Sequence, residues 1–225
     1  MDAPKAVIFD LDGCLVDSEP KMLESIAAQM RELGILDATF EEIRDSFLGV
    51  TMAVIRDHVS TRLGRDCPAD FQQQVEARLY EDYRQGLARM SGATILLQAL
   101  RAKSVPIAIA TGGSVERLGK TLFHSGLEAY FNGRAFSAEQ VQRGKPAPDI
   151  FLYASEQLGV AAEDCVVIED SPHGVEGALA AGMRAIGFDG GSHLRGIREL
   201  HARRLIAAGA EWVTRDLSSL VSLAD

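Results

Sequence analysis

Residues 5–13 of the chain are KAVIFDLDG, and they carry the strongest local signal of the fold. Four apolar residues, 6–9, are followed by Asp10, Asp12 and Gly13. A short apolar run bounded by charges and a turn residue is typical of a buried β-strand. Asp10 ends the run too early for a signal peptide or a membrane span. We therefore expect a buried strand with carboxylates at its end.

Similar apolar runs recur in the second half of the chain and alternate with helical patterns. Further strands are expected at residues 105–110, 165–168 and 184–188, with a weaker one near 212–213. The helical patterns between them end at glycines, which commonly terminate helices: Gly126, Gly159 and Gly182. Alternating strands and helices predict a Rossmann-like parallel sheet covered on both faces, which is a three-layer α/β/α core.

Residues 18–88 break this alternation. Their apolar residues follow helical spacing in four successive segments, and no convincing strand is present. Thr39 and Glu42 have the spacing of a capping box at the start of one helix. We predict an α-helical cap domain at residues 18–88, inserted into an α/β core domain formed by residues 1–17 and 89–225.

Composition narrows the possible functions. The chain has 225 residues, of which 47% are hydrophobic and 24% charged, as in an average globular protein. Its formal net charge of −9 disfavours nucleic acid as a partner. Cys14, Cys67 and Cys165 form no CxxC pair, which argues against a disulfide framework or a zinc site. Since no apolar run reaches 18 residues, we expect a cytoplasmic chain without a membrane partner.

Polar side chains follow the expected strands or lie in a nearby loop. They are Asp10, Asp12, Thr111, Lys145, Glu169 and Asp170. In open parallel sheets the carboxyl ends of the strands meet at one edge, where ligands bind. Two carboxylates there would repel by about 4 kcal/mol at roughly 4 Å and an effective dielectric constant of about 20. An all-oxygen set of ligands suits a hard divalent cation, and Mg²⁺ is the expected cofactor.

Four of these segments together resemble a known family. FDLDGCLVDSE at 9–19, Thr111 with its two glycines, Lys145 in GKPAPDIF and VIEDSPHGVEGALAAG at 167–182 resemble, in order, the motifs of haloacid dehalogenase superfamily phosphatases. The resemblance covers essentially the whole chain. The helical insert resembles the cap of the β-phosphoglucomutase and phosphoglycolate-phosphatase-like branch. Four ordered motifs are a far more specific signal than Asp-x-Asp alone.

The resemblance implies a role for each residue. Asp10 would attack phosphorus and form an aspartyl-phosphate, and Asp12 would serve as general acid and then general base. Lys145 would neutralise negative charge, while the Thr111 hydroxyl and the Gly112 amide would hold a phosphate oxygen.

The resemblance also implies a ligand set for Mg²⁺. It comprises the Asp10 carboxylate, the Asp12 backbone carbonyl and Asp170, with Glu169 acting through water. The cap would exclude bulk water and select the substrate. The implied activity is Mg²⁺-dependent hydrolysis of a small sugar, sugar-acid or polyol phosphate by a monomer or weak homo-oligomer.

Two alternatives remain open. A β-phosphoglucomutase-like mutase would carry a histidine where this chain has Met22, and Gly-x-Ser-Arg where it has GVTM at 49–52. A phospho-accepting signalling domain would place its acidic pair after the first strand and would lack the helical insert.

Other polar residues have no assigned role. Possible cap contacts to substrate are Lys21, Arg44, Arg56 and His58. We expect residues 190–193 to form a surface turn, although they could border the site. We expect His201 to be exposed or packed.

Overall fold

The computed structural model describes residues 3–47 and 52–224. The chain divides into two compact units. One consists of Met1–Asp17 together with Leu87–Asp225, and the other of Ser18–Gly86. The GVTM segment considered above lies outside the described residues except for Met52.

The first unit is built on a six-stranded parallel sheet in the order β3-β2-β1-β4-β5-β6. The strands are β1 (Ala6–Phe9), β2 (Ile107–Thr111), β3 (Ala135–Ser137), β4 (Cys165–Glu169), β5 (Arg184–Phe188) and β6 (Val213–Thr214). β1 is central, with Ile8 opposite Ala108 of β2 on one side and Val167 of β4 on the other. This confirms the predicted Rossmann-like parallel sheet.

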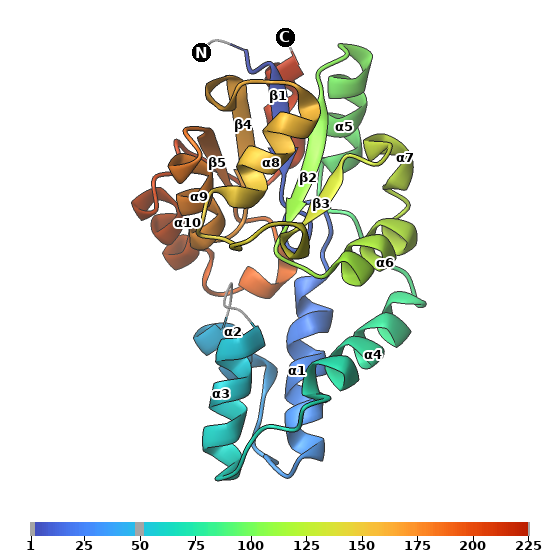
Figure 1. Cartoon of the computed structure of the whole chain (residues 1–225), viewed down its shortest axis with the longest axis vertical. Helices are drawn as coiled ribbons and strands as arrows, with labels where there is room; N and C mark the ends of the chain where they lie inside the picture. The colour runs from blue at the N-terminus through green and yellow to red at the C-terminus, as the bar shows by residue number, and fades with distance from the viewer. Residues whose placement is uncertain (1–2, 48–51, 225) are drawn as a thin grey trace. The chain divides into compact units, whose positions relative to one another are not determined.

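Helices cover both faces of this sheet. They are α5 (Ala93–Ala102), α6 (Val115–Ser125), α7 (Glu128–Phe131), α8 (Asp149–Leu158), α9 (Pro172–Ala180) and α10 (Arg198–Ala207). Shorter 3₁₀ segments are η1 (Ala138–Gln140), η2 (Ala162–Asp164), η3 (Ser192–Leu194) and η4 (Leu217–Ala224). In Figure 1, α8 and α9 lie on the near side of the sheet and α5 lies behind it.

Strand alternation divides the core into two layers. Ile8 and Val167 belong to one buried cluster with Phe151 of α8 and Val175 of α9. Phe9 points to the other face, where its ring meets that of Phe131 edge-on with 6.4 Å between ring centres. Strands β1, β2 and β4 are thus buried along their whole length, and the polar residues of these strands are confined to their ends.

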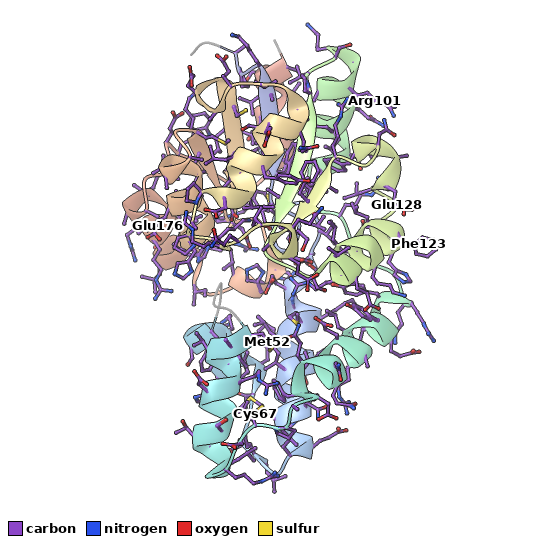
Figure 2. The ribbon with its side chains drawn as sticks, viewed as in Figure 1. Met52, Cys67, Arg101, Phe123, Glu128 and Glu176 are labelled. Atoms are coloured by element: carbon purple, nitrogen blue, oxygen red, sulfur yellow. The ribbon has the colours of Figure 1, made fainter. Side chains whose placement is uncertain are left out.

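The second unit consists of helices around its own apolar core. Its helices are α1 (Glu19–Glu32), α2 (Phe40–Phe47), α3 (Met52–Leu63) and α4 (Phe71–Tyr83). α1 packs against both α2 and α4. The predicted capping contact is present, since the Glu42 backbone N–H donates to Thr39 Oγ1 over 3.2 Å. Cys67, labelled in Figure 2, is buried just before α4.

Some elements escaped the sequence analysis. β3 has only three residues, too few for an apolar run to stand out, and α10 is rich in arginine with only His201 and Leu205 buried. No helix among residues 3–47 and 52–224 combines the length and apolarity needed to cross a bilayer.

Candidate active site

Three neighbouring strands carry the candidate site at their carboxyl ends. Asp10 directly follows β1, and its backbone N–H donates to the Ile168 carbonyl of β4 over 2.9 Å. Glu169 is the last residue of β4, and Asp170 follows it. Thr111 is the last residue of β2, on the other side of β1. Parallel pairing therefore brings together residues about 160 positions apart in sequence.

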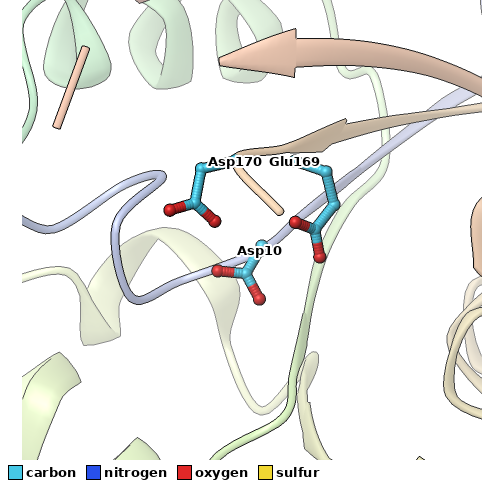
Figure 3. A group of neighbouring side chains, drawn as sticks. All are labelled: Asp10, Glu169 and Asp170. Atoms are coloured by element: carbon cyan, nitrogen blue, oxygen red, sulfur yellow. The ribbon is translucent and has the colours of Figure 1, made fainter. Parts of the chain in front are cut away.

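The carboxylates of Asp10, Glu169 and Asp170 form one cluster (Figure 3). Each offers an oxygen, and these oxygens all lie within 4.8 Å of one another. The three residues are 6%, 0% and 7% exposed. Water screens such charges poorly, so the cluster requires neighbouring positive charge or bound protons.

Lys145 supplies one positive charge. Its Nζ lies 2.6 Å from Asp10 Oδ1, forms an ion pair with Glu169, and sits 5.2 Å from the centre of the Phe151 ring. Burial lowers the pKa of Lys145, but attraction to Asp10 and Glu169 outweighs that effect and raises it overall. Lys145 is therefore a permanent cation.

A single lysine does not balance three carboxylates. Burial raises the pKa of Asp10 to about 8; Lys145 opposes this rise and Glu169 adds to it. A buried, oxygen-only cluster with surplus negative charge fits a hard divalent cation. The residues present thus fit Mg²⁺, which the carboxylates of Asp10, Glu169 and Asp170 could hold.

The start of α9 fixes the position of Glu169. The Ser171 backbone N–H donates to Glu169 Oε2 over 2.9 Å, and a Cβ on Gly174 would overlap the Glu169 carboxylate. Glycine at position 174 is therefore required by space. The helix cap is the Ser171 hydroxyl, which accepts from the Gly174 N–H.

Thr111 ends β2, and Gly112 and Gly113 follow it. Thr111 is buried, and its Oγ1 accepts from the Gly113 N–H over 3.1 Å, while Gly112 is exposed. Ser114 caps α6, so Thr111 does not serve as a helix cap. Ser137 of β3, which the sequence analysis missed, donates its hydroxyl to the Gly113 carbonyl over 2.5 Å.

Asp12 is paired with an arginine that the sequence analysis did not identify. Arg117 Nε and Nη2 lie 3.0 Å and 2.6 Å from Asp12 Oδ2. Arg117 is in the first turn of α6, close to the end of β2. In the sequence, the position of Arg117 about one helical turn after the Thr111 segment was the only feature that could have placed it near the site.

Two buried histidines flank Asp170. His201 Nε2 donates to the Asp170 backbone carbonyl over 2.6 Å, and burial lowers the His201 pKa. His193 Nε2 lies 3.9 Å from Asp170 Oδ2.

The expectation of a surface turn at 190–193 was wrong: Gly191 and His193 are buried. The Ser192 backbone N–H donates to Asp17 Oδ1 over 3.1 Å, which ties this segment to the residues that follow β1.

The candidate cap contacts have partners within the helical unit. Lys21 reaches the Asp82 carbonyl, Arg56 the Ala69 carbonyl, Arg44 the Asp45 carboxylate and His58 the Glu42 carboxylate. Their part in substrate binding stays a prediction.

A parallel sheet with acids and a threonine at its central strand ends, and a lysine from a loop beside them, is typical of α/β proteins that bind ligands along this edge. The family model described as haloacid dehalogenase-like hydrolase matches residues 4–182. The chain therefore belongs to the haloacid dehalogenase-like hydrolases and is an enzyme. This confirms the resemblance seen in the sequence and decides against a phospho-accepting signalling domain.

Characterised relatives and a solved structure share most of the chain. Hexitol phosphatase A of Escherichia coli is 35% identical over 187 residues, covering 81% of this chain and 82% of the relative. The 6-phosphogluconate phosphatase of E. coli is 31% identical over 198 residues, with 86% of each chain covered. A family hydrolase from Deinococcus radiodurans, solved with phosphate and sodium, is 33% identical with a TM-score of 0.78, covering 99% and 98% of the two chains.

Proposed function

We propose that this protein is a Mg²⁺-dependent phosphatase for a small sugar, sugar-acid or polyol phosphate, acting through a phosphorylated Asp10. The observation that carries the proposal is the buried Asp10 carboxylate held 2.6 Å from Lys145 beside Glu169 and Asp170. Relatives named as hexitol and 6-phosphogluconate phosphatases support the substrate class.

In the first half-reaction an Asp10 oxygen bonds to phosphorus as the bond from phosphorus to the leaving oxygen breaks. Asp12 gives its proton to that leaving oxygen, which departs as an alcohol. In the second half-reaction water attacks phosphorus, its proton passes to Asp12, and Asp10 is released with inorganic phosphate.

The remaining residues bind and orient. Lys145 keeps Asp10 and the phosphate oxygens from repelling one another, and the Thr111 hydroxyl and Gly112 amide bind a phosphate oxygen. Asp10, Asp170 and the Asp12 backbone carbonyl would hold Mg²⁺, with Glu169 as an outer ligand. The bound ion supplies positive charge that offsets the charge of the phosphoryl group.

Turnover of p-nitrophenyl phosphate tests this proposal. The wild type should release p-nitrophenol with Mg²⁺ and not with EDTA, and Asp10→Asn should lose turnover by at least about 10³-fold because the attacking oxygen is gone. Equal turnover by Asp10→Asn would contradict the role of Asp10.

A panel of phosphorylated sugars, sugar acids and polyols, compared by kcat/KM, would define the substrate. Conversion of β-glucose 1-phosphate to glucose 6-phosphate without phosphate release would identify a mutase instead.

A further inference from the structure

The ion pair between Arg117 and Asp12 is built into the α/β unit. Both guanidinium contacts, 3.0 Å from Nε and 2.6 Å from Nη2, go to the same oxygen, Asp12 Oδ2. The side chains are only 16% and 6% exposed. The Arg117 backbone N–H donates to the capping hydroxyl of Ser114 over 3.1 Å, so the first turn of α6 fixes where this side chain begins.

The end of β2 leaves space for the guanidinium. A Cβ on Gly113 would lie 3.2 Å from Arg117 Nε and 3.5 Å from Thr111 Oγ1. A side chain at position 113 would therefore crowd the guanidinium, which would have to shift by a few tenths of an ångström. An exposed ion pair would not need a neighbouring residue without a side chain.

We propose that Arg117 is a positioning residue: it holds the Asp12 carboxyl in the orientation from which Asp12 transfers a proton to the leaving oxygen. This inference rests on the proposed function. A carboxyl anchored through one oxygen by two charge-assisted hydrogen bonds has little rotational freedom. Proton transfer requires donor and acceptor within hydrogen-bond reach, so loss of the anchor would lower the fraction of productive complexes.

The inference predicts an effect that depends on the leaving group. An alkoxide leaving group needs its proton as the P–O bond breaks, whereas p-nitrophenolate is stable without one. The ratio kcat/KM includes only the steps up to departure of the leaving group. A badly oriented Asp12 should therefore lower kcat/KM for alkyl phosphates while affecting p-nitrophenyl phosphate little.

Arg117→Met and Arg117→Lys test this with p-nitrophenyl phosphate and a polyol phosphate that the wild type hydrolyses. For Arg117→Met we expect kcat/KM to fall about 10- to 100-fold with the polyol phosphate and less than about 3-fold with p-nitrophenyl phosphate. Arg117→Lys should recover part of the loss because lysine retains one charged donor. In an Asp12→Ala background, Arg117→Met should add no further loss, since it acts through Asp12.

Arg184→Met is the matched control. Arg184 also makes two contacts to one carboxylate, at 2.8 Å and 2.9 Å from Glu211, but it begins β5 and is remote from the strand ends that carry the site. It should leave both rates unchanged. Equal losses with both substrates in Arg117→Met and Arg117→Lys, or no loss in either, would overturn the inference. A wild type without Asp10-dependent turnover would instead overturn the proposed function.

Discussion

Lys145 shows how one residue shapes the site at the smallest scale. It lies between two carboxylates, Asp10 and Glu169, and its side chain is only 10% exposed. Removing one partner of a buried ion pair leaves an uncompensated charge, which costs far more than the pair contributes. The stability of the carboxylate cluster therefore depends on this ammonium group.

Lys145→Met should destabilise the metal-free protein by about 3 kcal/mol, because the buried Glu169 carboxylate loses its cation and Asp10 loses a hydrogen-bond donor. Urea denaturation in EDTA measures this. Arg143→Met is the control, since Arg143 is 66% exposed in its ion pair with Asp149 and should cost less than about 1 kcal/mol. Equal costs for the two variants would show that the Lys145 pairs are not buried in solution.

The raised pKa of Asp10 predicts a pH-dependent affinity for Mg²⁺. Burial raises this pKa from 3.8 to about 8 without metal, so the proton that Asp10 holds in the fold favours the folded state. This contribution to stability is complete below about pH 4 and is lost as the pH rises through 8. Mg²⁺ requires the carboxylate, so its binding releases a proton and should tighten up to about tenfold per pH unit between pH 6 and 8.

Calorimetric titration with Mg²⁺ at pH 6, 7 and 8, in buffers of different ionisation enthalpy, measures both the affinity and the released proton. Asp10→Asn should show weaker binding with little pH dependence. Wild-type affinity that stays constant from pH 6 to 8 would show that Asp10 is already ionised in the metal-free protein.

At the scale of elements, α9 and α6 each begin beside a strand end that carries a candidate site residue. Ser171 caps α9 beside Glu169, and Ser114 caps α6 beside Thr111. In α9 the fit extends to Gly174, where a side chain would occupy the position of the Glu169 carboxylate. The first turn of α9 and the end of β4 are thus a single packed unit.

Gly174→Ala should destabilise the protein by about 1–3 kcal/mol and weaken Mg²⁺ binding, because Glu169 must move. Gly119→Ala is the control, since a Cβ there meets nothing within 4 Å in the exposed part of α6. It should stabilise the protein by about 0.5–1 kcal/mol through helix propensity. Thermal unfolding with and without Mg²⁺ distinguishes the two. Stabilisation by Gly174→Ala would contradict the close approach to Glu169.

At the scale of the whole molecule, the chain leaves and re-enters the α/β unit at one place. The Asp17 N–H donates to the Ala88 carbonyl over 2.9 Å, and Val16 forms an antiparallel bridge with Arg89. The ends of the helical segment are therefore adjacent, as is common where one domain is inserted into another. Each unit also buries its own apolar residues, so we expect the α/β unit to fold without the helical segment.

Replacing residues 19–86 with a short Gly-Ser linker should leave an α/β unit that unfolds cooperatively. If the helical unit selects the substrate, this variant should keep Mg²⁺-dependent hydrolysis of p-nitrophenyl phosphate and lose most of its discrimination among sugar phosphates. Circular dichroism and relative kcat/KM values measure the two outcomes. A folded variant with unchanged selectivity would assign specificity to the α/β unit.

The sequence by itself determined the strand ends and the residues that occupy them. Asp10, Thr111 and Glu169 could be predicted because an apolar run followed by a polar residue is a local pattern, and parallel strands bring such ends together. The presence of four helices in the insert followed from their apolar spacing in the same way. β3 and the inward turn at 190–193 could not be predicted, because three residues or a pair of glycines carry no periodicity.

Only the tertiary structure decided which side chains touch. Arg117 meets Asp12 across 105 residues, and His201 meets the Asp170 carbonyl across 31. The sequence offers several arginines and histidines with equal claim to those contacts. Which of them reaches the site depends on how helices pack against the sheet, and packing is set by the summed burial of many distant apolar residues rather than by any local pattern.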